Sequence, residues 1–379
     1  MSFPIARLPR IEFGAGVIRK LPDIVAGYGK RLLLVTGRQS FIESPAGEWL
    51  FGELERKGFS WEHLRVAGEP SPAFVDGAVA QLRGSEIDAV IAIGGGSALD
   101  AAKAIAGLLK PGNSVMDHLE GVGPELPYRG PSTPFVAVPT TAGTGSEATK
   151  NAVLSVPGQY KKSFRDDALV AEWAIIDPDL LATCPPELIA ADGMDAFTQL
   201  LESLVSTRAN PMTDALARSG LAAASEALLP LFGHQSTEAR EKMAYASLMS
   251  GICLAQTGLG SVHGLAAPLG AFFPIPHGVA CGTLLAAATR VNLAALRERE
   301  PQSLALVKYD EVRRLLGADD LVAMLAGWTE RLALPRLSTY GVTEADLPRV
   351  VANSRGSSMK TNPIVLTDDE IARILAERL

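Results

Sequence analysis

What this 379-residue sequence lacks already narrows the kind of protein it encodes. Only three cysteines occur, widely spaced and odd in number, which argues against a disulfide framework and is typical of the reducing cytoplasm. The basic residues form no cluster, and 42 acidic against 35 basic side chains argue against nucleic acid as a partner. No apolar run reaches the roughly 18 residues of a membrane span, and the first ten residues lack the apolar segment of a signal peptide. We therefore expect a cytoplasmic globular protein that binds neither nucleic acid nor membranes.

The length and the order of the predicted elements indicate two domains. A chain of this length with 47% hydrophobic residues is too long for one core. In its first half, apolar strand-like runs such as 31–36 and 88–93 alternate with helical periodicity, which predicts a mostly parallel α/β sheet. In the second half, strand signals almost vanish and alanine- and leucine-rich helical segments dominate. The sequence therefore predicts an α/β domain over residues 1–182 and an all-helical domain over residues 183–379.

Three consecutive glycines follow one of these strands and precede a helix. The order is the apolar run at 88–93, then Gly94-Gly95-Gly96-Ser97, then a helix-forming segment at 98–105. This arrangement directs free backbone N–H groups and a helix dipole at an anion, and glycines let a pyrophosphate touch the backbone. A tight strand-to-helix turn that binds nothing has the same pattern, and the glycines alone do not separate the two possibilities.

Side chains that could bind a metal or take part in catalysis lie in two stretches of the second domain. Asp195, Gln199 and Glu202 are spaced i, i+4 and i+7 in a helical segment, so they share one face. His263 and His277, two of only five histidines, lie beside glycines in an apolar setting. An aspartate and two histidines form a plausible nitrogen and oxygen site for a first-row divalent metal. Each histidine taken alone is more typical of a hydrogen-bonded core residue.

Several motifs together make the chain resemble a known family. They are Phe13-Gly-Ala-Gly16, Gly94-Gly-Gly-Ser97 with Asp100 and Lys103, Pro139-Thr-Thr-Ala-Gly-Thr-Gly-Ser-Glu147, Asp177-Pro-Asp-Leu180, Gly193-Met-Asp-Ala196, His263-Gly264, Pro268-Leu-Gly270 and Pro276-His277-Gly278. On these motifs the chain resembles the iron-containing (group III) alcohol dehydrogenases, of dehydroquinate synthase-like fold, over nearly its whole length. The resemblance implies a Rossmann-like parallel-sheet domain followed by an all-α domain, and a homo-oligomer, in this family a dimer.

The resemblance also implies that the first domain binds NAD or NADP. By position in the family motifs, the glycine turn would hold the cofactor pyrophosphate through Gly95, Gly96 and Ser97. Thr140, Thr141 and Thr144 would contact the phosphate, ribose and nicotinamide side, and Asn151 and Lys162 would contact the ribose.

The turn at 36–40 bears on the choice between the two cofactors. An acidic residue in such a turn binds the ribose 2′-hydroxyl of NAD and repels the 2′-phosphate of NADP. This chain has Thr-Gly-Arg-Gln-Ser there, with no acid. Gly37 leaves room and Arg38 or Ser40 can meet a phosphate, although Arg38 is equally typical of a surface arginine. The sequence therefore leans slightly towards NADP.

Four metal ligands are implied by the resemblance, and Asp195, His263 and His277 are three of them. The family's second ligand, a histidine four residues after the aspartate, is Gln199 here, and a neutral amide oxygen is a poorer ligand than imidazole. A further family histidine, four residues after His263, is Ala267. The divalent metal, Fe²⁺ or Zn²⁺, is therefore held with Gln199 or water completing the shell, is held weakly, or is absent. Beyond these ligands no catalytic residue is assigned.

Together these features predict an oxidoreductase that transfers a hydride reversibly between NAD(P) and a small alcohol or its aldehyde or ketone, with assistance from the metal. Two alternatives stay open. One is a family member that binds the nucleotide but has altered or metal-independent chemistry, because Gln199 and Ala267 replace histidines. The other is a fold relative, such as a polyol-phosphate dehydrogenase or a dehydroquinate synthase-like lyase. The motif at 139–147 speaks against that second alternative.

Overall fold

Six parallel strands form the sheet that the alternating sequence pattern predicts. A computed structural model describes residues 2–379 and gives the strand order β1-β8-β5-β4-β2-β3, with every neighbouring pair parallel. The strands are β1 (Arg10–Phe13), β2 (Arg31–Thr36), β3 (Ser60–Arg65), β4 (Ala89–Gly94), β5 (Phe135–Pro139) and β8 (Trp173–Ile176). The predicted fold class, a parallel α/β domain followed by an all-helical one, is confirmed.

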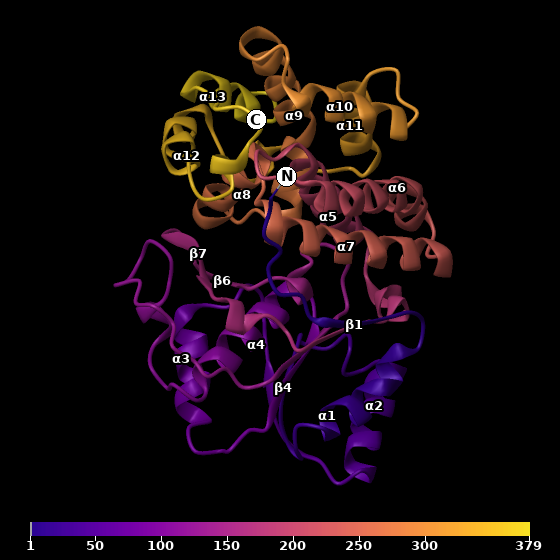
Figure 1. The fold of residues 1–379 in the computed structure, drawn as a ribbon, viewed down its shortest axis with the longest axis vertical. Helices are drawn as coiled ribbons and strands as arrows, with labels where there is room; N and C mark the ends of the chain where they lie inside the picture. Colours follow the sequence, from indigo (N-terminus) through magenta and orange to yellow (C-terminus); the bar gives the residue numbers. More distant parts are fainter. Residues whose placement is uncertain (1) are drawn as a thin grey trace. The chain divides into compact units, whose positions relative to one another are not determined.

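Helices cover both faces of this sheet, with β4 between the two layers (Figure 1). They are α1 (Leu21–Ala26), α2 (Pro45–Arg56), α3 (Pro72–Gln81) and α4 (Gly96–Leu108). Leu32 and Leu34 of β2 share a core with α1 and α2. Leu33 and Val35 alternate with them along the strand and are equally buried, on the face that α4 covers. Burial on both faces explains why this strand is a continuous apolar run.

The carboxyl ends of three strands meet at one edge of the sheet. Thr36 of β2 is paired with Ile93 of β4, and Gly94 of β4 is paired with Pro139 of β5. Open α/β sheets bind their ligands outside this edge. The cofactor residues predicted at positions 37, 95–97 and 140–144 all follow these strand ends directly.

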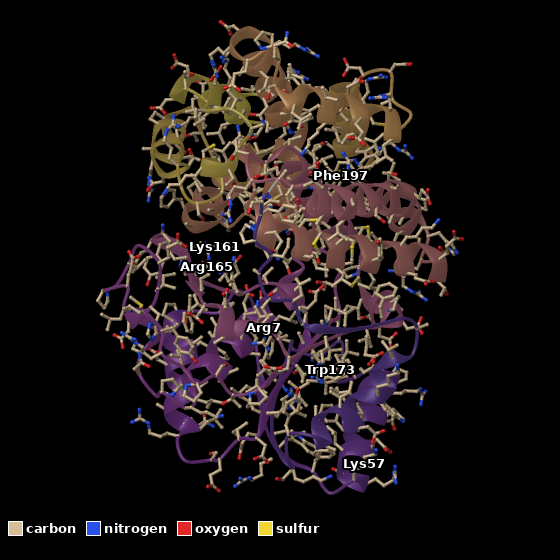
Figure 2. The ribbon with its side chains drawn as sticks, in the orientation of Figure 1. Arg7, Lys57, Lys161, Arg165, Trp173 and Phe197 are labelled. Carbon is tan, nitrogen blue, oxygen red and sulfur yellow. The ribbon has the colours of Figure 1, made fainter. Side chains whose placement is uncertain are left out.

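A two-stranded ribbon, β6 (Asn151–Val156) and β7 (Tyr160–Arg165), was not expected from the sequence pattern. β7 carries charged side chains in succession, so its hydropathy does not show a strand. β6 packs against α4, and Lys161 of β7, labelled in Figure 2, pairs with Glu69. The ribbon carries two of the predicted cofactor residues, one on each strand.

From residue 185 onward the described chain contains helices and no strand. The helices are α5 (Pro186–Val205), α6 (Pro211–Gly233), α7 (Thr237–Thr257), α8 (Ser261–Phe272), α9 (His277–Arg299), α10 (Leu304–Leu315), α11 (Leu321–Arg331), α12 (Leu347–Asn353) and α13 (Asp368–Ala376). Helix α5 is central to this part, because it packs against α6, α7 and α9. Its Phe197, labelled in Figure 2, is fully buried with its ring 5.0 Å from that of Trp328.

Helix α9 is apolar enough for its composition to need an explanation. Among residues 2–379 it alone is long and apolar enough to cross a membrane, by length and composition. However, 78% of that window is buried inside the structure, against α5, α8 and α11. Its place in a helical core accounts for its apolar character.

Contacts along the chain define two units. One comprises Ala6–Val156 and Lys161–Cys184, and the other comprises Pro185–Leu379 with residues 2–5 and Pro157–Tyr160. The division between Cys184 and Pro185 lies close to the boundary at 182 that the sequence predicts. It falls where the prolines at the start of α5 end the α/β pattern.

Candidate cofactor and metal sites

The glycine turn between β4 and α4 is shaped by two threonines that pack on it. A Cβ added to Gly96 would lie 2.8 Å from Cγ2 of Thr144, and one added to Gly95 would lie 3.2 Å from Cγ2 of Thr141. Gly95 caps α4 without any side-chain hydrogen bond, so the first N–H groups of the helix keep their capacity for a ligand. The structure therefore brings four predicted cofactor residues together around a helix N-terminus suited to a phosphate.

Lys103 ties the threonine-rich loop to helix α4. Its ammonium is fully buried and donates hydrogen bonds to the Ser146 carbonyl at 2.7 Å, the Thr149 hydroxyl at 3.0 Å and the Asn151 carbonyl at 2.7 Å. Burial lowers the pKa of Lys103 to about 8, and the nearby Asp100 opposes that shift. The sequence offered Asp100 and Lys103 only as parts of a motif. The structure shows that Lys103 holds the loop and the start of β6 in place.

The remaining predicted cofactor residues lie at the same sheet edge or on the ribbon. Gly37 follows β2 and approaches Gly94 closely, since a Cβ on Gly94 would lie 3.3 Å from the Gly37 nitrogen. Ser97 is half-buried in the first turn of α4, and Thr140 donates its backbone N–H to the Gly94 carbonyl at 3.0 Å. Lys162 lies on β7 with its ammonium beside the turn at residue 121.

A second cluster lies wholly within the helical unit. Asp195 of α5, His263 of α8, and His277 and Cys281 of α9 each direct one ligand atom to a common point, and these atoms lie within 4.8 Å of one another. Oδ1 of Asp195 is 3.1 Å from Nε2 of His263 and 3.9 Å from Nε2 of His277. The structure thus brings together the three predicted ligands, one from α5 and two from the consecutive helices α8 and α9.

Glu202 fixes the orientation of His263. One carboxylate oxygen of Glu202 is 2.7 Å from Nδ1 of His263, and the other accepts the backbone N–H of Val262 at 2.7 Å. With Nδ1 held by Glu202, Nε2 of His263 faces the Asp195 oxygen. The position between these two atoms suits a proton on Nε2 or a metal ion that replaces it. A carboxylate that orients a ligating histidine in this way is the usual support of a metal site.

The electrostatics of the cluster also favour a cation. Burial would raise the pKa of Asp195, but His277 and His263 lower it to about 2. Burial opposes a charge on His263, yet Cys281, Asp195 and Glu202 hold its pKa well above the usual range. Burial raises the pKa of the Cys281 thiol to about 12, so its thiolate form requires a positive charge beside it. Carboxylate, imidazole and thiol donors together fit a first-row divalent ion such as Zn²⁺ or Fe²⁺.

Gln199 and Ala267, the two positions that depart from the family pattern, lie in different surroundings. Gln199 is buried one turn after Asp195, and its side-chain oxygen accepts a hydrogen bond from the Ser250 hydroxyl at 2.8 Å. Ala267 is half-buried one turn after His263 on α8 and carries no polar atom on its side chain.

Sequence reasoning missed two members of this region. In the sequence, Cys281 was noted only as one of three scattered cysteines, and Glu202 only as part of a helix face. The spacing of His277 and Cys281, four residues apart in a helical segment, is the signal that could have found the thiol. The contact between Glu202 and His263 joins two separate helices, so no spacing within one segment of the sequence predicts it.

The described chain thus combines a glycine turn at the carboxyl edge of a parallel sheet, suited to a phosphate, with a metal-type cluster among helices. Two family models match the chain, "Iron-containing alcohol dehydrogenase" over residues 9–178 and "Fe-containing alcohol dehydrogenase family, C-terminal" over residues 189–379. The protein therefore belongs to the iron-containing alcohol dehydrogenase family, whose members are oxidoreductases acting on alcohols and carbonyl compounds.

Individual relatives agree with this assignment over the full length. The chain is 34% identical to alcohol dehydrogenase 4 of Schizosaccharomyces pombe, covering 96% of this chain and 86% of that protein. It is 30% identical to the NAD-dependent methanol dehydrogenase of Bacillus methanolicus, covering 98% of each. Among solved structures, an iron-containing alcohol dehydrogenase from Thermotoga maritima superposes with a TM-score of 0.87 at 30% identity, covering 100% of this chain and 99% of that one.

Proposed function

We propose that the protein catalyses reversible hydride transfer between NAD(P) and a small alcohol or its aldehyde or ketone. The observation that carries this proposal is the convergence of Asp195, His263 and His277, with Glu202 behind His263, in a chain of this family. Burying carboxylates and imidazoles together costs free energy unless they are paired with one another or with an ion, and one ion can satisfy all four donor atoms that lie within 4.8 Å of one another.

On the cofactor side, the free N–H groups at the start of α4 bind the pyrophosphate, and Gly95 and Gly96 allow its close approach. Thr140, Thr141 and Thr144, with Asn151 and Lys162 of the ribbon, contact the phosphate, ribose and nicotinamide side. The hydrogen bonds of Lys103 keep that loop fixed before the cofactor arrives, so less ordering is needed on binding.

On the substrate side, Asp195, His263 and His277 would hold a divalent metal, with Gln199, another side chain or water completing the shell. Such an ion, when bound, polarises the substrate carbonyl and stabilises the alkoxide as a Lewis acid. Glu202 retains the proton at Nδ1 of His263, which keeps Nε2 available as a ligand atom. Ala267 offers no proton donor, so the substrate proton leaves through water or a ribose hydroxyl.

NADP is the cofactor that the turn after β2 favours slightly. Residues 36–40 contain no carboxylate to repel a 2′-phosphate, and Arg38 and Ser40 are exposed there. Gly37 has no atom within 4 Å of the place where a Cβ would lie, so a phosphate has room beside it.

The proposed setting is the cytoplasm, and the proposed assembly is a homodimer, as the family resemblance implies. The buried, unpaired thiols of Cys253 and Cys281 suit a reducing compartment. Light scattering of the purified protein tests the assembly directly.

The proposed activity is tested by measuring metal content and then NADPH and NADH oxidation across a panel of small aldehydes, before and after chelation. We expect turnover that chelation abolishes and that zinc or ferrous iron restores. Full activity in a rigorously metal-free preparation would contradict the role of the metal and leave the hydride transfer standing.

Metal-independent or lost chemistry is the second candidate, and Gln199 and Ala267 favour it because each removes an imidazole. Tight nucleotide binding without turnover of any aldehyde in the panel would support this candidate against the first.

A further inference from the structure

The fourth ligand position of the helical cluster is the question that the sequence left open. Gln199 occupies the position where the family has a histidine, yet its amide oxygen already accepts a hydrogen bond from Ser250 of α7. The Cys281 sulfur, in contrast, lies 3.6 Å from Nε2 of His263 and 3.8 Å from Nε2 of His277. The thiol therefore lies beside the ligand atoms of both histidines.

The separations in the cluster match those around one metal ion. A tetrahedral zinc ion with nitrogen and oxygen ligands at about 2.0–2.1 Å and sulfur at about 2.3 Å has ligand atoms roughly 3.3–3.6 Å apart. The distances of 3.1 and 3.9 Å from the Asp195 oxygen to the two histidines, and of 3.6 and 3.8 Å from the sulfur, lie within a few tenths of an ångström of these values. Four of the six separations therefore suit a single ion, and all six are within 4.8 Å.

Two glycines bring Cys281 to this point. A Cβ on Gly278 would lie 2.3 Å from the Ala191 carbonyl oxygen, and one on Gly282 would lie 2.8 Å from Cβ of Met194. Helix α9 thus approaches α5 more closely, on either side of Cys281, than it could with a larger residue at position 278 or 282. Since Met194 precedes Asp195, this close approach sets the thiol against the aspartate. His277 and Cys281, one helical turn apart, then face the same point from α9.

We propose that Cys281 is the fourth protein ligand of the metal, in place of the residue expected at position 199, and that the resulting site prefers Zn²⁺ to Fe²⁺. This inference rests on the proposed function, since it concerns the ion held by the same cluster. The thiol loses its proton to solvent when the metal–sulfur bond forms. A thiolate beside two imidazoles and one carboxylate is a softer donor set than one of imidazole and carboxylate alone, and soft donors favour zinc.

The first experiment replaces the metal of the intact protein with Co²⁺ and records its absorption spectrum. We expect a thiolate-to-cobalt charge-transfer band in the near ultraviolet for the wild-type protein, for Gln199→Ala and for Cys253→Ser. The last is a matched control, because Cys253 is also fully buried but contacts the Thr213 carbonyl instead of the cluster. The band is expected to be absent in Cys281→Ser.

Zinc affinity, measured by chelator competition, gives a second readout of the same variants. Loss of a direct ligand is expected to weaken zinc binding by roughly 100-fold in Cys281→Ser, at the upper end of what loss of a supporting residue costs. Ferrous iron binding is expected to weaken less in Cys281→Ser, and the control Cys253→Ser should bind zinc as the wild-type protein does. Gln199→Ala should also keep its zinc affinity if Cys281 is the fourth ligand, and a fall there would assign that position to Gln199 instead. NADPH binding to each variant, followed by fluorescence, verifies that it is folded.

X-ray absorption of the wild-type zinc protein decides the question even if Cys281→Ser fails to fold. We expect one sulfur scatterer at about 2.3 Å. A shell without sulfur, or a cobalt band that survives in Cys281→Ser, overturns the assignment of Cys281 and leaves the metal-assisted function intact. A wild-type protein that retains neither zinc nor cobalt overturns both the assignment and the metal's role in the proposed function.

Discussion

Two buried carboxylates show how differently the two candidate sites are built. Glu147, in the loop beside the glycine turn, has its pKa raised to about 7 by burial, and Lys103 offsets only part of that shift. Asp195, in the helical cluster, is equally buried, but His277 and His263 lower its pKa to about 2. The cofactor region is thus made of backbone groups and small side chains, with a carboxylate that is easily protonated. The helical cluster keeps its carboxylate ionised and ready for a cation.

The largest effect is expected from removing the ionised carboxylate of this pair. Asp195→Ala eliminates one ligand and leaves His263 without the partner of its Nε2. We expect loss of stoichiometric metal and a fall in kcat/KM of roughly a thousandfold, since a Lewis acid contributes several kcal/mol to such a reaction. Metal analysis and steady-state kinetics on one aldehyde test this, with unchanged NADPH affinity as the control. A variant that keeps its metal would show that the other donors suffice.

The contrasting carboxylate, Glu147, is expected to affect stability instead of metal binding. Its pKa is higher in the folded state than in an unfolded chain, so the fold binds more protons between pH 4.5 and 7. Stability contributed by this group is therefore present below pH 4.5 and is lost as the pH rises to 7. Glu147→Gln removes this loss and stabilises the protein at pH 8 by up to about 3 kcal/mol.

Calorimetry of the wild-type protein and Glu147→Gln between pH 4.5 and 8 measures this difference. We expect the two melting temperatures to diverge as the pH rises, with the variant the more stable at pH 8. Parallel profiles would mean that Glu147 is ionised in the fold and compensated by Lys103.

A smaller effect is expected from the residue that orients His263. Glu202→Gln retains the size of the side chain and can still accept a hydrogen bond, but it removes the charge behind the imidazole. Metal affinity is expected to fall about 10- to 100-fold, the usual cost of losing such support. The pH dependence of metal binding should also shift to lower pH, because His263 without the carboxylate is less basic and loses its competing proton at lower pH. An unchanged affinity would reduce Glu202 to a purely structural residue.

The same contrast explains what the sequence could reveal. The fold and the glycine turn were predictable, because β2 and β4 are continuous apolar runs and a close approach of backbone to ligand demands glycine at positions 95 and 96. The three helix-borne ligands followed from the family resemblance. The place of Cys281 in the cluster could not be predicted in this way. It depends on how closely α9 approaches α5, which Gly278 and Gly282 determine in three dimensions. The β6–β7 ribbon was not predicted either, because the charged residues of its second strand interrupt any apolar pattern.

The smallest effect tests the backbone character of the cofactor region. Gly96→Ala places a Cβ 2.8 Å from Thr144, so the threonine or the turn must move. Overpacking of this kind costs about 1–3 kcal/mol, and we expect NADPH affinity to fall about tenfold with the metal content unchanged. Gly77→Ala in α3 is the matched control, because an added Cβ there has no atom within 4 Å. That control should stabilise the helix by about 0.5–1 kcal/mol and leave binding unaffected. If Gly96→Ala binds NADPH as tightly as the control does, the close fit of Thr144 to the turn serves packing alone, and the pyrophosphate lies elsewhere along the edge of the sheet.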